Sequence, residues 1–174
     1  MATSLYDLSV ASYLQTVGAV AGFMDRAAKH CAETGADPDD FVGLQLFDDM
    51  APFHFQIRSV AHHSVGALEG VKSGLFHPPA AVGPLPYAEL QAMVATTEDV
   101  LRGFTPQEVN GWAGKDVSFQ IGERKIPFTA EGFILSFSLP NFYFHATTAY
   151  DLLRTQGVPL GKRNYLGQMR MKAA

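Results

Sequence analysis

The chain has 174 residues and a net charge of −4, and 47% of its residues are hydrophobic against 17% charged. This balance excludes a disordered chain and predicts one folded domain over residues 1–174 with a sizeable core. The 13 Lys and Arg residues, against 17 Asp and Glu, form no long run outside the C-terminal tail, which argues against nucleic-acid binding.

Cysteine content and the N-terminal sequence both bear on the compartment. Cys31 is the only cysteine in the sequence, so no disulfide can form within the chain, as suits a reducing cytosol. The first residues, MATSLYDLSV, lack the basic and apolar runs of a signal peptide, and no apolar stretch reaches the ~18 residues of a membrane span. We therefore expect a cytoplasmic protein that does not associate with membranes.

The first predicted element is an amphipathic helix over about residues 9–34. Its apolar residues recur at three- and four-residue steps, and Gly35 supplies a helix end. Asp37-Pro38 then combines a capping residue with a proline at the first helical position, which predicts a short turn through Phe41.

A second helix is predicted over about residues 52–72, where the helical period returns, and it should end near Gly74. The next segment, LFHPPAAVGPLP at residues 75–86, contains four prolines and one glycine. Such a composition fits neither a helix nor a central strand, so we expect a long surface connection there.

The third helix is predicted over about residues 87–104, and Thr105-Pro106 should start another short turn. Apolar and polar residues alternate on both sides of Gly122, which predicts a small hairpin over residues 116–129. Thr129 should cap a last helix that runs to about Gln156 with Pro140 inside it. Four long helices with a hairpin insert indicate an all-α four-helix bundle, whose sites are built from inward side chains of facing helices.

A polar stripe follows the last predicted helix. Ser138, Asn141, His145 and Thr148 are spaced three, four and three residues apart, so at roughly 100° per residue they share one side of the helix. Large apolar residues flank this stripe. It should therefore either satisfy itself by hydrogen bonds or line a cavity that could hold a ligand or cofactor.

The second helix offers a polar strip that could face this stripe. His62 points roughly 160° away from the apolar face and is expected to face solvent, whereas His63 lies roughly 80–100° off and is the better inward candidate. Gln56 and Ser59 share the side of His63. Two readings stay open at this point: a buried histidine such as His145 is more often a hydrogen-bonded core residue, but imidazoles also bind Zn²⁺ or Ni²⁺.

Several segments resemble a known family. These are LYDLSV near the start, DDMAPF before the second helix, the hairpin, and LPNFYFHATTAYDLLRTQGVPLGKRNYLG at the end, in which PNFYFH and GVPLGKR are the most specific. Together they resemble a bacterial family of uncharacterised proteins that is similar to a branch of the DinB/YfiT-like four-helix bundles. The resemblance implies an up-down-down-up bundle, usually a homodimer, in a superfamily of metalloenzymes that includes thiol-dependent transferases and an isomerase.

The resemblance also implies a metal site. In many such relatives three histidines bind a divalent metal, one from the second helix and two spaced four apart on the last. Counting back from LRTQG places His145 at the second position of that pair and Asn141 at the first. With His63 from the second helix, these residues would form the metal site, in which an amide oxygen is a weaker ligand than an imidazole.

Two functions follow from these observations, and the sequence leaves open whether the protein is an enzyme. The favoured one is a dimeric bundle that binds a small ligand or a partner, with Ser138, Thr148 and Gln56 as ligand contacts and a degenerate metal site. The alternative is a divalent-metal-dependent enzyme, similar to thiol S-transferases, that would use Zn or Ni.

Overall fold

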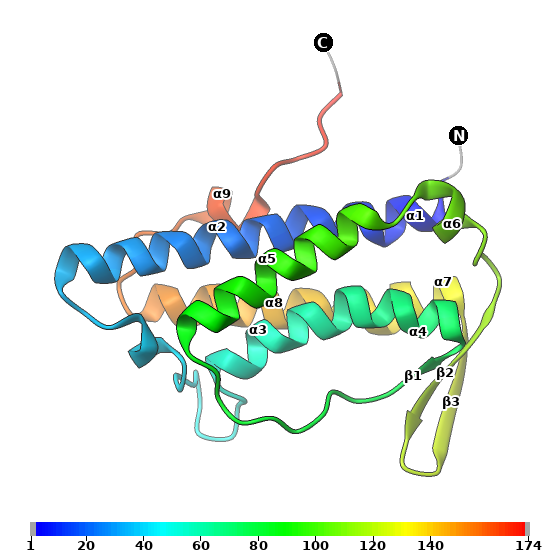
Figure 1. Cartoon of the computed structure of the whole chain (residues 1–174), viewed down its shortest axis with the longest axis horizontal. Coiled ribbons are helices and arrows are strands. Elements are labelled where there is room, and N and C mark those ends of the chain that lie inside the picture. The colour runs from blue at the N-terminus through cyan, green and yellow to red at the C-terminus, as the bar shows by residue number, and fades with distance from the viewer. Residues whose placement is uncertain (1–2, 173–174) are drawn as a thin grey trace.

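The computed structural model describes residues 3–172, and these residues form a mostly helical domain with a small sheet at one end (Figure 1). A single-turn helix α1 (Leu5–Leu8) leads into α2 (Val10–Thr34). Gly35 ends α2 with a φ of 74°, in the left-handed region that glycine adopts without steric cost. The predicted end of the first long helix is therefore confirmed.

The other helices follow in chain order. They are α3 (Phe53–Ala61), α4 (Ala67–Ser73), α5 (Tyr87–Gly103), α6 (Pro106–Asn110), α7 (Ala130–Phe133), α8 (Leu139–Thr155) and α9 (Lys162–Leu166), with a 3-10 turn at Pro38–Phe41. Helices α2 and α3 each pack against both α5 and α8, and aromatic side chains such as Phe23, Phe53 and Phe142 are fully buried among them. Within residues 3–172, no helix is long and apolar enough to cross a membrane.

The sheet has the strand order β1-β2-β3. Strands β2 (Asp116–Ile121) and β3 (Arg124–Thr129) form the predicted antiparallel hairpin, whereas β1 (Leu75–Phe76) pairs in parallel with β2 and places Phe76 opposite Phe119. The expectation that residues 75–86 are a surface connection throughout is wrong for these first two residues. They precede the prolines, so their backbone can still pair at the edge of a sheet, and Pro78 then ends the pairing.

The C-terminal segment contains one more short helix. Residues 162–166 form α9, which packs against α2. The side-chain amide of Gln15 on α2 donates to the carbonyl of Leu166 over 3.0 Å. This contact holds the segment after the last long helix on the surface of the domain.

Both helical segments that face each other around the site contain a π turn, His62–Gly66 between α3 and α4 and Ile134–Ser138 between α7 and α8. The apolar periodicity of the sequence had predicted unbroken helices here. Pro140 explains the second π turn, because proline has no N–H and its ring would clash with the carbonyl of residue 136 in a regular helix. Within the first π turn, the Ser64 hydroxyl donates to the carbonyl of Val60 over 2.7 Å. Such a bond from a serine side chain to the carbonyl four residues earlier competes with the backbone hydrogen bonds of the helix.

A buried serine joins the two π turns. The Ser138 hydroxyl lies 2.6 Å from the carbonyl oxygen of His63 and donates to it, because a carbonyl can only accept. The Tyr13 hydroxyl also lies 2.6 Å from Ser138, and it must therefore be the donor in that second bond. Tyr13 and Ser138 are both fully buried. This chain of hydrogen bonds fixes the position of His63 relative to α8.

Replacing Ser138 with alanine should destabilise the domain. The change leaves the His63 carbonyl and the Tyr13 hydroxyl buried without this partner, which costs about 1–3 kcal/mol for each buried group left unsatisfied. Urea unfolding of Ser138→Ala measures the loss. Ser136→Ala is the matched control, because that exposed hydroxyl bonds only to Gly132 in its own helix, and it should change the free energy of unfolding by no more than about 0.5 kcal/mol. Equal effects of the two changes would contradict this account.

Candidate functional site

A cavity of about 340 Å³ lies between α3, α8 and the segment that follows β1. Its lining combines four phenylalanines and two prolines with a few polar side chains: Phe55, Ser59, His63, Phe76, Pro78, Pro79, Phe119, Phe137, Asn141 and His145. We call it the imidazole cavity. Its volume and its mostly apolar walls with a few polar groups are typical of sites that bind small molecules.

The orientation of His145 follows from its hydrogen bond. Its Nδ1 lies 2.7 Å from Oε1 of Gln56, and the Gln56 amide donates in turn to the carbonyl of Ala51 over 2.7 Å. Because Gln56 donates through its nitrogen, its oxygen must accept, so Nδ1 of His145 carries the hydrogen. In the neutral ring Nε2 then carries a lone pair, which leaves it free to accept a hydrogen bond from a molecule in the cavity.

His63 lies next to His145, with ring centres 5.6 Å apart and ring planes inclined by only 18°. His63 is buried, as the position of this residue on the predicted helix indicates. Its Nδ1 is also buried and has no hydrogen-bond partner among the described residues. An unpaired buried nitrogen beside a cavity is costly unless a ligand or solvent molecule satisfies it.

Both imidazoles are held in the neutral form. The pKa of His63 is lowered to about 3, mainly by burial and to a smaller extent by the neighbouring His62 and His145 rings. Burial also lowers the pKa of His145 to about 4, with a smaller contribution from His62. At neutral pH the cavity therefore offers uncharged nitrogen atoms, which serve as hydrogen-bond partners or metal ligands and not as positive charges.

The other predicted site residues are distributed differently around the cavity. Asn141 lines it, and its Nδ2 donates to the carbonyl of Phe137 over 2.7 Å, which leaves Oδ1 as an acceptor. The Thr148 hydroxyl donates to the carbonyl of Phe144 over 2.8 Å within its own helix. Ser138 joins the two π turns, and Gln56 accepts the hydrogen bond of His145 Nδ1 without lining the cavity. The structure thus brings His63, Asn141 and His145 together, while the other three do not line the cavity.

The wall formed by Phe76, Pro78 and Pro79 was not predicted from the sequence, and the expected orientation of His62 was wrong. His62 was expected to face solvent, but it is half-buried, its ring lies 4.6 Å from that of Phe76, and its Nε2 donates to the carbonyl of His77 over 2.9 Å. The reason is that the segment after β1 folds back over the helix. The apolar residues before the prolines in LFHPP were the only local signal of this contact.

The donor set does not complete a three-ligand metal centre. Among residues 3–172, no three side chains of His, Cys, Asp or Glu gather as a metal-binding group. Two neutral imidazoles are suitable ligands for Zn²⁺ or Ni²⁺, but the third position would fall to the amide oxygen of Asn141, a weaker ligand for such ions.

The buried histidines predict a loss of stability in acid. The unfolded rings have a pKa near 6.5, whereas burial lowers the folded pKa of His63 to about 3 and that of His145 to about 4. The unfolded state therefore binds more protons between these values, so stability is full above pH ~6.5 and falls as the pH drops towards 4 and then 3. The free energy of unfolding should fall by up to about 1.4 kcal/mol per pH unit for each histidine, and less for the partly exposed His145.

Urea unfolding at pH 7 and pH 5 tests this dependence. The double variant His63→Asn, His145→Asn should lose less stability over this range than the unaltered protein does. His77→Asn, a change at an exposed ring, is the control and should keep the original pH dependence. If the double variant also kept the original pH dependence of stability, the two buried rings would not be the source of that dependence.

Comparison with known proteins agrees with this architecture. A family model described as a domain of unknown function, DUF1993, matches residues 5–166. A crystal structure described as that of a DinB family member protein from Shewanella denitrificans is 25% identical in sequence, covers 98% of this chain and 96% of its own, and has a TM-score of 0.81. No curated protein matches the chain significantly. The resemblance to DinB-like proteins is therefore confirmed, and the chain belongs to the DUF1993 family of domains of unknown function.

Proposed function

We propose that this protein is a cytoplasmic, DinB-like helical bundle that binds a small, largely apolar molecule in the imidazole cavity, at a position where the metal site is degenerate. The observation that carries the proposal is the cavity of about 340 Å³ in which aromatic walls surround two neutral imidazoles. The 25% identity to a DinB family member over nearly the whole chain supports the same type of fold.

The lining defines the chemistry of the ligand. Phenylalanine rings favour a flat apolar body, because aromatic pairs contribute beyond the apolar area that they bury. The polar atoms free to contact the ligand include two acceptors, Nε2 of His145 and Oδ1 of Asn141. Neutral imidazoles give an anion no charge to pair with. A neutral molecule that carries an aromatic ring and a hydroxyl or N–H donor therefore fits this cavity best.

The order of the long helices supports an up-down-down-up bundle. In Figure 1, α2 and α8 run in one direction, and α5 and the α3–α4 segment run in the other. We also propose a homodimer, as the resemblance to DinB-like bundles implies; Leu135 and Phe144 on the last helical segment are 49% and 55% exposed and are apolar side chains that a second copy could cover. Light scattering at micromolar concentration tests this assembly, and a strict monomer would contradict it.

Binding of 2-naphthol tests the proposed site, with 2-methylnaphthalene as a probe of similar shape that lacks the donor. Titration calorimetry should show saturable binding of 2-naphthol and binding of 2-methylnaphthalene that is about tenfold weaker, because the hydrogen bond to His145 is lost. In His145→Phe, which keeps a ring in place, the affinity for the two probes should become similar. Equal affinity of the unaltered protein for both probes, or no binding of either, would refute the proposal.

A matched control separates the site from the rest of the surface. His30 lies near the end of α2 and does not line the imidazole cavity, so His30→Phe adds the same ring elsewhere. This variant should bind both probes as the unaltered protein does. Thermal unfolding of both variants checks that each remains folded.

A second candidate function rests on the pair of imidazoles. We propose as the alternative a divalent-metal-dependent enzyme similar to thiol S-transferases, in which His63, His145 and Asn141 would hold Zn²⁺ or Ni²⁺. The 5.6 Å between the ring centres and the neutral state of both rings support it. Bound metal would supply a positive charge that favours the thiolate form of a substrate thiol. The weakness of an amide as the third ligand is the reason that we place this function second.

Metal analysis distinguishes the two functions. The protein must be purified without chelators and without a nickel resin, and its metal content measured by mass spectrometry. The alternative predicts about one ion per chain, a rise in melting temperature on zinc addition, and loss of that rise in His145→Ala. A metal-free protein whose melting temperature responds to zinc no more than that of His145→Ala would exclude it.

A further inference from the structure

A second cavity lies on the other side of the segment that follows β1. We call residues 77–82 of that segment the strap; it belongs to the loop along the lower edge of Figure 1. The cavity has a volume of about 500 Å³ and is lined by residues of α3, the first π turn, α4, β1, the strap and α5: Arg58, His62, Gly66, Glu69, Gly70, Ser73, Leu75, Phe76, His77, Pro78, Pro79, Ala80 and Met93. It shares Phe76, Pro78 and Pro79 with the imidazole cavity, so the strap forms a wall between them.

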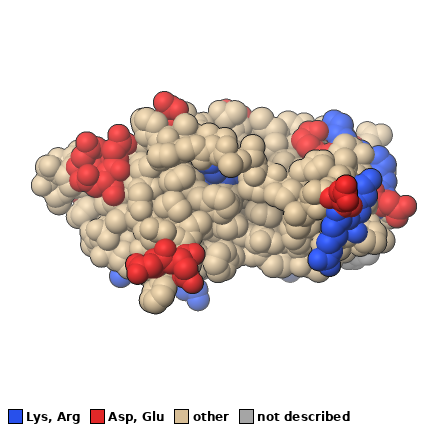
Figure 2. Space-filling model, turned by 90° about the horizontal axis from the view of Figure 1, so that it is seen from below, with Lys and Arg blue, Asp and Glu red and all other residues tan. Residues whose placement is uncertain are grey.

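The charge in this second cavity comes from Arg58. Arg58 is half-buried as a residue, and its guanidinium donates to the carbonyls of Ala80 and Val82 over 3.0 and 2.9 Å. Arg58 forms no ion pair with any carboxylate among residues 3–172. Figure 2 shows basic atoms set into a hollow on an otherwise uncharged stretch of the face seen from below.

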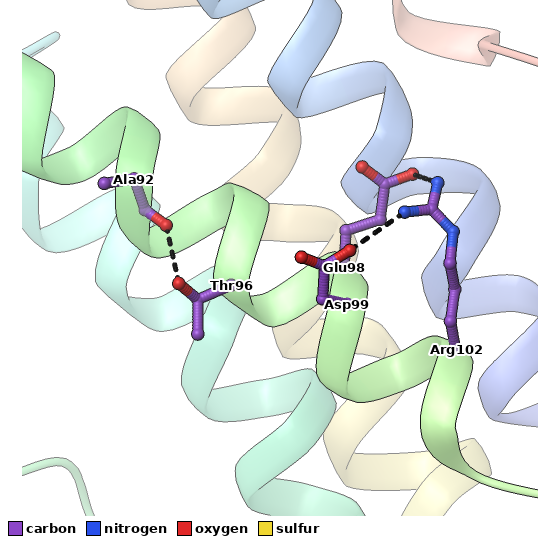
Figure 3. Close-up of polar contacts among 5 residues, drawn as sticks. All are labelled: Ala92, Thr96, Glu98, Asp99 and Arg102. Atoms are coloured by element: carbon purple, nitrogen blue, oxygen red, sulfur yellow. Dashed lines mark hydrogen bonds and ion pairs between the residues drawn. The ribbon is translucent and has the colours of Figure 1, made fainter.

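Arg102 is an arginine with counter-ions, and Arg58 differs from it. Arg102, on the exposed face of α5, pairs with Glu98 over 2.5 Å and with Asp99 over 3.2 Å, so its charge is neutralised (Figure 3). Arg58 instead contacts two neutral carbonyls, which use two of its five N–H donors. A half-buried cation with spare donors and no counter-ion attracts an anion that can reach it.

The charge of Arg58 also acts on its neighbours. Burial lowers the pKa of His62, and the positive charge of Arg58 lowers it further, against the effect of the hydrogen bond to His77. Burial and Arg58 lower the pKa of His54 in the same way. Glu69 also lines the cavity, but its side chain is exposed, so water and salt screen its repulsion of an anion.

We propose that this second cavity binds a small oxyanion, the carboxylate or phosphate group of a small molecule, with Arg58 as the cation that receives it. The planar guanidinium presents paired N–H donors that match the oxygens of both groups. This site is independent of the imidazole cavity, whose lining lacks a charged side chain and favours a neutral ligand.

NMR titration of the full chain with inorganic phosphate and with acetate, at constant ionic strength, tests the proposal. We expect saturable shifts of the backbone amides of Gly66, Gly70 and Ser73, which line the cavity. Arg58→Gln should weaken binding about tenfold or more, because it removes the charge from the hydrogen bonds. Saturation by acetate alone indicates a carboxylate ligand and saturation by phosphate alone indicates a phosphate, and either result supports the site.

Two further variants keep the test decisive. Arg102→Gln removes an exposed arginine and should leave the affinity unchanged. Arg58→Lys keeps the charge but loses the fork that holds the strap, and it should bind more tightly than Arg58→Gln. Shifts that do not saturate, an Arg58→Gln affinity equal to that of the unaltered protein, or equal weakening by Lys and Gln would each overturn the proposal. In the last case Arg58 would serve only to hold the strap.

Discussion

The hydrogen bond from the Ser138 hydroxyl to the His63 carbonyl is the interaction on which the rest of the site depends. Each carbonyl of a regular α-helix already accepts one bond within the helix, and a π turn alters this hydrogen-bond ladder locally. Here each helical segment is widened by a π turn, His62–Gly66 on one side and Ile134–Ser138 on the other. The bond of 2.6 Å between them is buried, and it sets His63 beside His145.

A second set of contacts fixes the chemistry of the two rings. Gln56 receives the hydrogen of His145 Nδ1 and is itself held by the carbonyl of Ala51, so the lone pair of Nε2 is directed away from this bond. The apolar wall around Phe76 makes protonation of either ring unfavourable, since a charge in such surroundings loses its hydration. The π turns fix the relative position of the two imidazole rings, and the apolar residues around Phe76 keep both rings neutral. Both are needed for two neutral imidazoles to lie side by side in one cavity.

Local sequence patterns were sufficient for some of these features and insufficient for others. The period of the apolar residues, the Gly35 helix end and the Thr129 cap are encoded within a few residues, and the structure confirms them. The same period placed His63 inward. The strap was missed because its position depends on Arg58 and His62, which lie about twenty residues earlier in the chain and bond to its backbone carbonyls. A backbone carbonyl has no sequence signature, so composition could show only that residues 75–86 were not helical.

The π turns illustrate a different limit. Pro140 does signal that the last helix cannot remain regular, but it does not say whether the chain kinks, ends or widens, and the outcome depends on what packs against it. Ser138 resolves that choice, because the widened turn lets its hydroxyl reach the His63 carbonyl and accept from Tyr13. A kink at this point would separate Ser138 from both partners and leave three polar groups buried and unpaired. The arrangement of the site is therefore a consequence of satisfying buried polar groups, and the position of the two imidazoles follows from it.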